Sequence, residues 1–259
     1  MQLQEAADAL GVHYQTAYGW VRQGLLPARK VGRGYEVTAG DVRALAAQRE
    51  AGREPARLIH VRDYSAQADR LYSAIVAGEE TRARQGLARL AGGVPLIDLC
   101  QQILGPALRR MGDGWASGQV SIAREHRASA ICERLLAAYT HQPPGRPRGT
   151  AVVATPPGER HSLPALMAAA CLREDRWLVH HLATDLPVAQ VSQLALDVGA
   201  DLIVLSCATS QAGHAAVTAA GGISAAHPDL VVLVGQPADS LHDLRRQARL
   251  TRAPEPGPP

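Results

Sequence analysis

A carboxylate and a histidine stand two positions apart in this sequence, shortly after an apolar segment that reads as a buried strand. The segment is Thr150–Thr155, and the pair is Glu159 and His161, which follow a Pro-Pro-Gly turn. A carboxylate that bonds one imidazole nitrogen fixes the tautomer and leaves the other nitrogen free to bind a metal. The pair is therefore a candidate metal site, and a solvent-exposed histidine is an equally good explanation. His180 and His181, at the end of the next expected strand, are a weaker metal candidate.

A second group of candidate ligand-binding residues combines a tryptophan with a Glu-His pair that follows after nine intervening residues. Trp115 lies at the expected end of a helix, between Gly114 and Gly118, where a large ring can be presented rather than buried. Glu125 and His126 lie early in the next expected helix and can offer polar contacts to a ligand. Taken alone, the three residues favour a structural role, because tryptophan is usually part of a core and an acid at a helix start favours the helix dipole.

Basic and aromatic side chains gather in the first part of the chain. Four basic residues and no acid lie between His13 and Tyr35. Cationic groups suit the phosphates of DNA, and polar side chains on a recognition helix suit the base edges of the major groove. The candidate DNA-contact residues are Tyr14, Gln15, Thr16, Tyr18, Arg22, Lys30, Arg33 and Tyr35. Gln15, Thr16 and Arg22 are the candidates for base contacts, and each can equally touch phosphate alone.

The elements that must present these DNA-contact candidates are short. Two helical patterns flank a glycine-containing turn, which is the helix-turn-helix spacing, and a basic segment after them reads as a tight hairpin or wing. Thr38 can cap a third helix. The expected elements are helices at 4–10, 13–23 and 39–49 and a hairpin at 30–37, in a domain at residues 1–50. A small helical domain with an ordinary solvated basic edge is the alternative.

Two larger regions must position Trp115 and His161. Helical periodicity without a convincing strand pattern predicts a four-helix bundle at residues 58–141. Alternating apolar and helical segments predict a parallel, doubly wound sheet at residues 150–250, and such sheets bind ligands at the carboxyl ends of their strands. The expected bundle helices are 58–77, 79–90, 96–115 and 121–140. The expected strands are 150–155, 177–182, 201–206 and 230–235, with helices at 162–174, 188–199 and 211–226 between them.

Composition sets further limits. The 259 residues allow about two domains by length, and 46% of them are hydrophobic, so the chain can bury real cores. Segments 51–57 and 141–149 read as linkers, and 251–259 reads as a disordered tail. No apolar run approaches the roughly 18 residues of a membrane span. The N-terminus lacks a signal-peptide pattern, so we expect a cytoplasmic protein.

Charge, cysteines and glycine motifs exclude some classes of function. The net charge of +3 is only a weak indication of a polyanionic partner. The four cysteines are scattered, which indicates buried, reduced thiols rather than structural zinc or disulfides. Neither a GxGxxG motif nor a P-loop follows the first expected strand, which argues against a dinucleotide site.

Together, these motifs resemble the CarH/LitR type of light-dependent transcriptional regulator over nearly the whole chain. The likeness rests on the MerR-like pattern EAADALGV…TAYGWVRQGLLPARKVGRGYEV, on PAL…W-x9-EH from Pro106 to His126, and on Glu-x-His at 159–161 after a strand. In that family a winged helix-turn-helix domain precedes a helical bundle that caps a flavodoxin-like, cobalamin-binding domain. The resemblance therefore implies a regulator rather than an enzyme, with adenosylcobalamin as cofactor and a double-stranded DNA operator as partner.

The resemblance also implies a role for each site residue. His161, supported by Glu159, matches the histidine that binds cobalt as the lower axial ligand. Trp115 matches the tryptophan over the upper face of the cofactor, and Glu125 and His126 match the pair near the adenosyl group. The remaining match is Ser206, where the family places a serine near the buried nucleotide tail. The implied function is a repressor that is a homo-oligomer, expected to be a tetramer with cofactor in the dark, and that releases DNA when light breaks the Co–C bond.

Four features depart from the family pattern. Pro164 and Gln236 stand where the family has glycines, and a helical pattern at 240–250 takes the place of a fifth strand. Ala116 stands where members that trap cobalt after illumination have a histidine, so the light-state adduct stays open. Three alternatives also stay open: a transcription factor with a degenerate sensor, a sensor of cobalamin level or redox state, and a corrinoid carrier for a methyltransferase. The N-terminal helix-turn-helix pattern argues against the corrinoid carrier.

Overall fold

The computed structural model describes most of the chain as two compact units. The described residues are 1–10, 12, 14–22, 26–31, 34–50, 63–91, 94–140, 143, 145–237 and 239–251, without the side chains of 15, 16, 19, 22 and 47–50. One unit comprises Met1–Tyr64 and Gln85–Pro95, and the other comprises Ser65–Arg84 and Leu96–Pro259. The linker expected at 51–57, the helix start at 58–62 and most of the expected tail lie outside the described residues.

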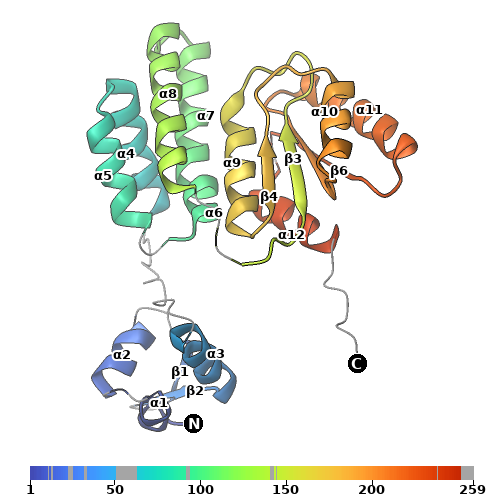
Figure 1. The fold of residues 1–259 in the computed structure, drawn as a ribbon. Helices are drawn as coiled ribbons and strands as arrows, with labels where there is room; N and C mark the ends of the chain where they lie inside the picture. Colours follow the sequence, from blue (N-terminus) through green and yellow to red (C-terminus); the bar gives the residue numbers. More distant parts are fainter. Residues whose placement is uncertain are drawn as a thin grey trace. The chain divides into compact units, whose positions relative to one another are not determined.

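The first unit contains the expected helix-turn-helix elements and wing (Figure 1). They are α1 (Leu3–Ala9), α2 (Tyr14–Arg22), β1 (Ala28–Val31), β2 (Gly34–Val37) and α3 (Ala39–Glu50). The hairpin strands pair antiparallel, with Ala28 opposite Val37. Thr38 Oγ1 accepts a hydrogen bond of 3.1 Å from the Asp41 N–H, which is the helix start expected from the sequence.

An apolar core and a short backbone ladder hold this unit together. Leu3 and Ala6 of α1 and Leu10, the residue after it, repeat at helical spacing and are buried, because this face packs on the rest of the unit. The Val37 N–H donates to the Met1 carbonyl, and the Met1 amino group donates to the Val37 carbonyl, each over 3.0 Å. The chain start is therefore fixed to the wing.

The second unit begins with a helical bundle. The bundle elements are α4 (Tyr64–Ala77), α5 (Glu80–Ala91), α6 (Leu96–Asp98), the π-helix η1 (Leu99–Leu104), α7 (Gly105–Ala116) and α8 (Ile122–Tyr139). Of these, Tyr64 and the part of α5 from residue 85 on belong to the first unit. The first residues of α5 are joined to α8, since Arg134 donates hydrogen bonds of 2.7 to 3.3 Å to the Glu80 carboxylate. The expectation of a four-helix arrangement is confirmed, with one correction to a helix.

That correction concerns 96–115, which the sequence predicts as one α-helix. The structure instead has a wide π turn at η1, where the Gly105 N–H bonds back to the Cys100 carbonyl. The next residue, Pro106, has no N–H and its ring clashes with the carbonyl four residues earlier, so a regular α ladder cannot run through it. The bundle helix therefore changes pitch just before α7.

The rest of the second unit is a four-stranded parallel sheet in the order β4-β3-β5-β6. Its elements are β3 (Thr150–Ala154), α9 (Ser162–Glu174), β4 (Leu178–His181), α10 (Val188–Asp197), β5 (Leu202–Ser206), α11 (Ser210–Ala226), β6 (Val231–Gly235) and α12 (Leu241–Thr251). Among the described residues, α12 follows β6 with no further strand, as expected. The flavodoxin-like fold class is thereby confirmed, including its shortened end.

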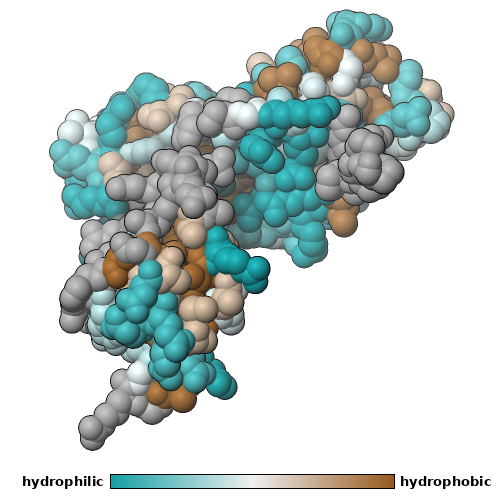
Figure 2. Space-filling view, turned by 60° about the horizontal axis from the view of Figure 1, so that its bottom comes forward, coloured by the Kyte–Doolittle hydropathy of each residue, from teal (hydrophilic) through white to brown (hydrophobic). Residues whose placement is uncertain are grey.

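Two apolar layers cover the two faces of this sheet. Residues of α9 and α12 pack on one face and residues of α10 and α11 on the other. At the edge where the strands begin, Asp175 is buried and accepts bidentate hydrogen bonds from Arg249. Figure 1 places α12 at this end, and Figure 2, which turns the same end toward the viewer, shows mainly hydrophilic residues there. None of the described helices has the length and apolarity that a membrane span requires.

Among the described residues of the second unit, the polar contacts between bundle and sheet include the following four. Three gather around α6 and η1: Glu174 accepts from the Leu96 N–H over 3.1 Å, Gln101 from the Leu241 N–H over 2.8 Å, and Asp98 lies 2.9 Å from His242 Nε2. The fourth is Ser162 Oγ, which donates to the Glu133 carboxylate over 2.7 Å.

Candidate functional site

The loop between β3 and α9 carries the Glu-x-His pair and is tightly held. Thr155 Oγ1 donates to the Glu159 carbonyl over 2.9 Å and accepts from the Asp185 N–H over 3.0 Å. The Asp185 carboxylate in turn accepts from the Gly158 N–H over 2.7 Å. Gly158 has a φ of 83°, a conformation that side chains other than glycine rarely adopt, so the turn requires this residue. The loop therefore fixes Glu159 beneath the carboxyl edge of the sheet.

Glu159 is buried and uses both carboxylate oxygens. Its Oε1 accepts from the His161 N–H over 2.9 Å and lies 2.5 Å from His161 Nδ1. Its Oε2 accepts from the N–H groups of Ala208 and Thr209, over 2.8 and 3.2 Å. One carboxylate thus connects the loop after β3 with the loop after β5. Burial by itself would raise the pKa of Glu159, but the hydrogen bonds from His161 and Ala208 lower it below its ordinary value.

His161 projects from this support into solvent. It is the residue before α9, and its side chain is 61% exposed although Glu159 is 1% exposed. Because Nδ1 is held by the carboxylate, Nε2 is the nitrogen that remains for a metal. The arrangement is the carboxylate-histidine pair expected from the sequence, and metal binding itself remains a prediction.

Of the two weaker histidine candidates at the end of β4, His181 is less suited to a metal. His181 Nε2 is buried without a hydrogen-bond partner among the described residues. Burial lowers the pKa of His181, and the nearby Arg173 cation lowers it further. His181 therefore does not present that nitrogen to a ligand from solvent.

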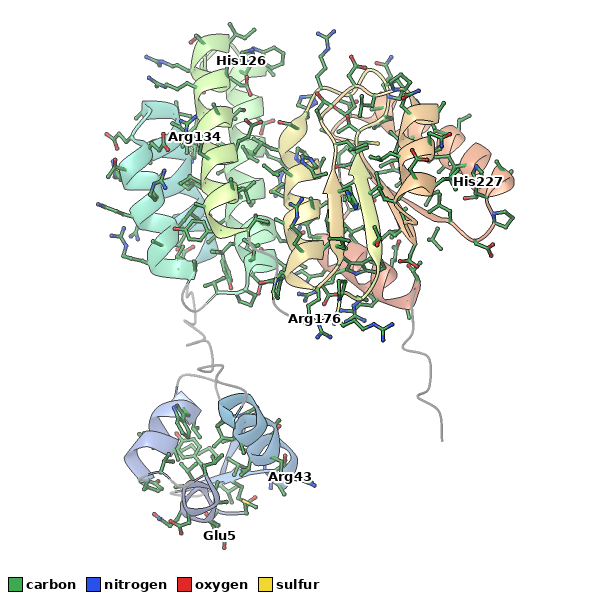
Figure 3. All side chains as sticks on the ribbon, viewed as in Figure 1. Glu5, Arg43, His126, Arg134, Arg176 and His227 are labelled. Atoms are coloured by element: carbon green, nitrogen blue, oxygen red, sulfur yellow. The ribbon has the colours of Figure 1, made fainter. Side chains whose placement is uncertain are left out.

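The second candidate group lies at the end of the bundle where α7 ends and α8 begins. Trp115 is 52% exposed, so its ring is presented rather than buried. Glu125 Oε1 accepts from Ser129 Oγ over 2.7 Å, and Glu125 Oε2 lies 2.5 Å from His126 Nδ1. Figure 3 shows His126 at this tip of the bundle. The three residues that the sequence singled out are therefore gathered at one end.

This tip extends beyond the start of α9. Ser162, the residue after His161, bonds Glu133 of α8, so these two residues lie at one level. His126 is seven residues earlier in α8, which at about 1.5 Å per residue is about 10 Å further along the helix. Figure 1 shows α7 and α8 projecting past the end of α9. A flat ligand on His161 would therefore face the bundle tip.

A cavity of about 220 Å³ lies between η1–α7, α9 and the ends of β5 and β6. An apolar cavity of about 150 Å³ holds benzene, so this one can take a fused bicyclic ring. Ser206 lines it, as do Pro164 and Gln236, the positions that depart from the family pattern. These departures form walls of the hollow and do not fill it.

Three of the described DNA-contact candidates on α2 and the wing are partly buried. Tyr14, Tyr18 and Tyr35 are half-buried and pack on the core. The ring centroids of Tyr14 and Tyr18 are 6.2 Å apart, and those of Tyr18 and Tyr35 are 5.7 Å apart. Lys30 is exposed. Gln15, Thr16, Arg22 and Arg33 lie outside the residues whose side chains are described. DNA contact by any of these residues remains a prediction.

The sequence reasoning missed several residues of the site. Asp185, Ala208 and Thr209 hold the Glu159 loop, and Arg109 lines the cavity. Only for Arg109 did the sequence contain a signal: Gly105-Pro106 interrupts the helical pattern shortly before it.

Comparison with known families covers nearly the whole chain. A family described as helix-turn-helix domain matches residues 1–50, and two families described as B12 binding domain match residues 67–140 and 149–249. The monomethylamine corrinoid protein of Methanosarcina barkeri has a similar fold, with a TM-score of 0.59 at 16% identity over 72% of this chain and 98% of that one.

Two curated relatives combine DNA binding with regulation in their names. The HTH-type transcriptional repressor CarH of Myxococcus xanthus is 28% identical over 145 residues, which is 56% of this chain and 48% of that protein. The repressor CarA of the same organism is 32% identical over 114 residues, or 44% and 38%. The match spans about half or less of each relative. The chain thus joins a helix-turn-helix domain to a two-part B12-binding domain, which confirms its resemblance to the CarH type of transcriptional regulator.

Proposed function

We propose that this chain is a DNA-binding repressor whose state is set by a bound cobalamin, and by light when the cofactor is adenosylcobalamin. The observation that carries the proposal is the exposed His161, held at Nδ1 by the buried Glu159 at the carboxyl edge of a parallel sheet. The names of the curated relatives support the repressor part.

The residues present fit a cobalamin. His161 Nε2 would be the lower axial ligand of cobalt, and the cavity beside Ser206 would receive the nucleotide tail. Trp115, Glu125 and His126 would contact the adenosyl group from the bundle tip. When bound, the adenosyl form supplies a Co–C bond that visible light breaks.

The bundle is the element that would report the state of the cofactor. It is joined to the sheet mainly around α6 and η1, whereas its other end carries the exposed Trp115. Ligand contacts at the tip would hold the bundle closed and favour a homo-oligomer that binds operator DNA, and loss of the adenosyl group would remove them. Turning a mostly assembled population into a mostly dissociated one requires about 5 kcal/mol of differential binding.

One observation favours a second function, a sensor of cobalamin level that does not respond to light. Ala116 follows Trp115 directly, so this position offers no imidazole to the metal. The cavity, by contrast, argues against a sensor domain that has lost its ligand, because the shortened sheet still leaves a hollow.

Spectra and DNA affinity test the proposal together. The chain is purified in the dark with adenosylcobalamin, its visible spectrum is recorded, and operator-library DNA binding is measured before and after illumination. We expect bound colour, a light-induced spectral change and weaker DNA binding in the light. Colour without a change of DNA affinity indicates the level sensor, and absence of colour contradicts cobalamin binding.

The axial ligand has its own variant and control. His161→Ala should show the base-off spectrum of a cobalamin without a lower nitrogen ligand, in place of the spectrum of an imidazole-bound cobalamin. His227→Ala removes a histidine beyond α11, on the side of the sheet away from the bundle in Figure 3, and should keep the imidazole-bound spectrum. An imidazole-bound spectrum in the His161 variant would refute the assignment.

A further inference from the structure

The cavity between bundle and sheet has one cationic side chain in its lining, and that side chain has no counterion. Arg109 of α7 is exposed and lines the cavity, and it forms no ion pair among the described residues. The acidic residue in the lining, Asp239, is occupied, because its carboxylate accepts from the Gln236 N–H over 2.8 Å. The cavity wall therefore carries a free guanidinium that the fold does not use.

The neighbouring Arg110 shows what a structural arginine does in the same helix. It donates to the Asp69 carboxylate of α4, and its guanidinium carbon lies 4.3 Å from the centre of the Tyr72 ring. Arg110 thus ties α7 to α4, whereas Arg109 forms no such contact. The two adjacent arginines have different environments and make a matched pair for experiment.

The π turn before α7 explains why Arg109 faces the cavity. Cys100, Gly105 and Arg109 all line it, and a π turn brings residues five apart onto one face. Arg109 Nη1 lies 3.4 Å from the position that a Cβ on Gly105 would occupy. Because Gly105 has no side chain, the guanidinium can lie along this wall.

We propose that Arg109 binds the phosphodiester of the nucleotide tail of cobalamin, so that the bundle recognises the tail of the cofactor as well as its upper face. The inference rests on the proposed function, which places that tail in this cavity. A guanidinium suits phosphate because its planar fork donates two parallel, charge-assisted hydrogen bonds. The hydroxyl of Ser206, in the same lining, is a further polar group for the tail.

This assignment predicts the class of corrinoid that the chain accepts. A complete cobalamin offers the phosphodiester, and a cobinamide, which lacks the nucleotide and its phosphodiester, does not. The bundle wall should therefore discriminate between the two, even though both offer the same corrin ring and adenosyl group to His161 and Trp115.

The test measures dark binding of adenosylcobalamin and adenosylcobinamide to the full chain and to three variants. The variants are Arg109→Gln, Arg109→Lys and, as the matched control, Arg110→Gln. Thermal unfolding without ligand checks that each variant folds, which we expect for Arg109 because its side chain is exposed and unpaired. Loss of a charge-assisted contact should weaken adenosylcobalamin binding about 10- to 100-fold in the Arg109→Gln variant.

Binding of adenosylcobinamide decides whether Arg109 recognises the phosphodiester or only supports the fold. We expect Arg109→Gln to leave adenosylcobinamide affinity unchanged, Arg109→Lys to weaken adenosylcobalamin binding to an intermediate degree, and Arg110→Gln to change both affinities by one factor. Equal effects of Arg109→Gln on both ligands, or no effect on either, would overturn the inference while leaving cobalamin binding intact. If the unaltered chain bound neither ligand, the proposed function would fail as well.

Discussion

At the scale of single residues, the site depends most on the buried carboxylate of Glu159. It orients His161 and joins two loops, and its pKa in the folded chain is below its ordinary value because N–H groups outweigh the effect of burial. A carboxyl group with a lowered folded-state pKa adds stability above its unfolded-state pKa of about 4.3, and this stability is lost as the pH falls through the folded-state value.

The first prediction follows from the lowered folded-state pKa of Glu159. Between about pH 5 and pH 3 the free energy of unfolding should fall more steeply for the unaltered chain than for Glu159→Gln, which has no titrating group at this position. Urea unfolding at a series of pH values measures it. Two parallel curves would show that Glu159 carries no such linkage.

The four thiols give a second prediction at this scale. All are free and buried, as the sequence indicated, and burial raises the pKa of Cys132 to about 12 and that of Cys207 to about 11. The thiolate is the reactive form, so the folded chain should resist iodoacetamide at pH 8, and all four thiols should react after unfolding. Mass spectrometry counts the adducts. Rapid labelling of Cys132 or Cys207 in the folded chain would contradict their burial.

Sequence reasoning at the residue scale worked where the chemistry was local. Glu159 and His161 share one short loop, so their contact could be expected from spacing alone. Arg109 could not be found in this way, because the face it occupies depends on the π turn before it. The tyrosines of α2 were predicted only as DNA contacts, and their half-buried stack, which follows from packing against the wing, could not be read from the sequence.

At the scale of elements, the turn between α7 and α8 sets where Trp115 is presented. Gly114 is buried beside Trp115, and a Cβ at Gly114 would lie 2.8 Å from Val120 Cγ2, which is closer than atoms can approach. Val120 is itself buried, so the neighbour cannot move freely. The turn that carries the tryptophan therefore requires a glycine.

Gly114→Ala should destabilise the chain by about 1–3 kcal/mol, as overpacking in a filled core does. Gly112→Ala is the matched control in the same helix, because a Cβ there meets nothing within 4 Å, and alanine should stabilise the helix by about 0.5–1 kcal/mol. Thermal unfolding of both variants measures the difference. Equal melting temperatures would show that the turn tolerates a side chain.

At the scale of the whole molecule, the alternation of apolar and helical segments was enough to predict the fold class, including the absence of a fifth strand among the described residues. The strand order could not be predicted from the sequence pattern. β3 lies between β4 and β5, and each of these parallel pairings requires the chain to cross over the sheet first. The cavity could not be predicted from the pattern either, since the cavity walls come from six elements, several of them far apart in the chain.

The last prediction concerns how DNA binding by the helix-turn-helix domain and cobalamin binding affect each other. If cobalamin favours the DNA-binding oligomer, the factor by which adenosylcobalamin raises DNA affinity in the dark must equal the factor by which DNA raises cobalamin affinity. Couplings of this kind are about 1–3 kcal/mol, or about 5- to 150-fold. Titrating each ligand in the absence and presence of the other measures both factors. His161→Ala should abolish both, and a dark DNA affinity that ignores adenosylcobalamin would mean that the two parts of the chain do not communicate.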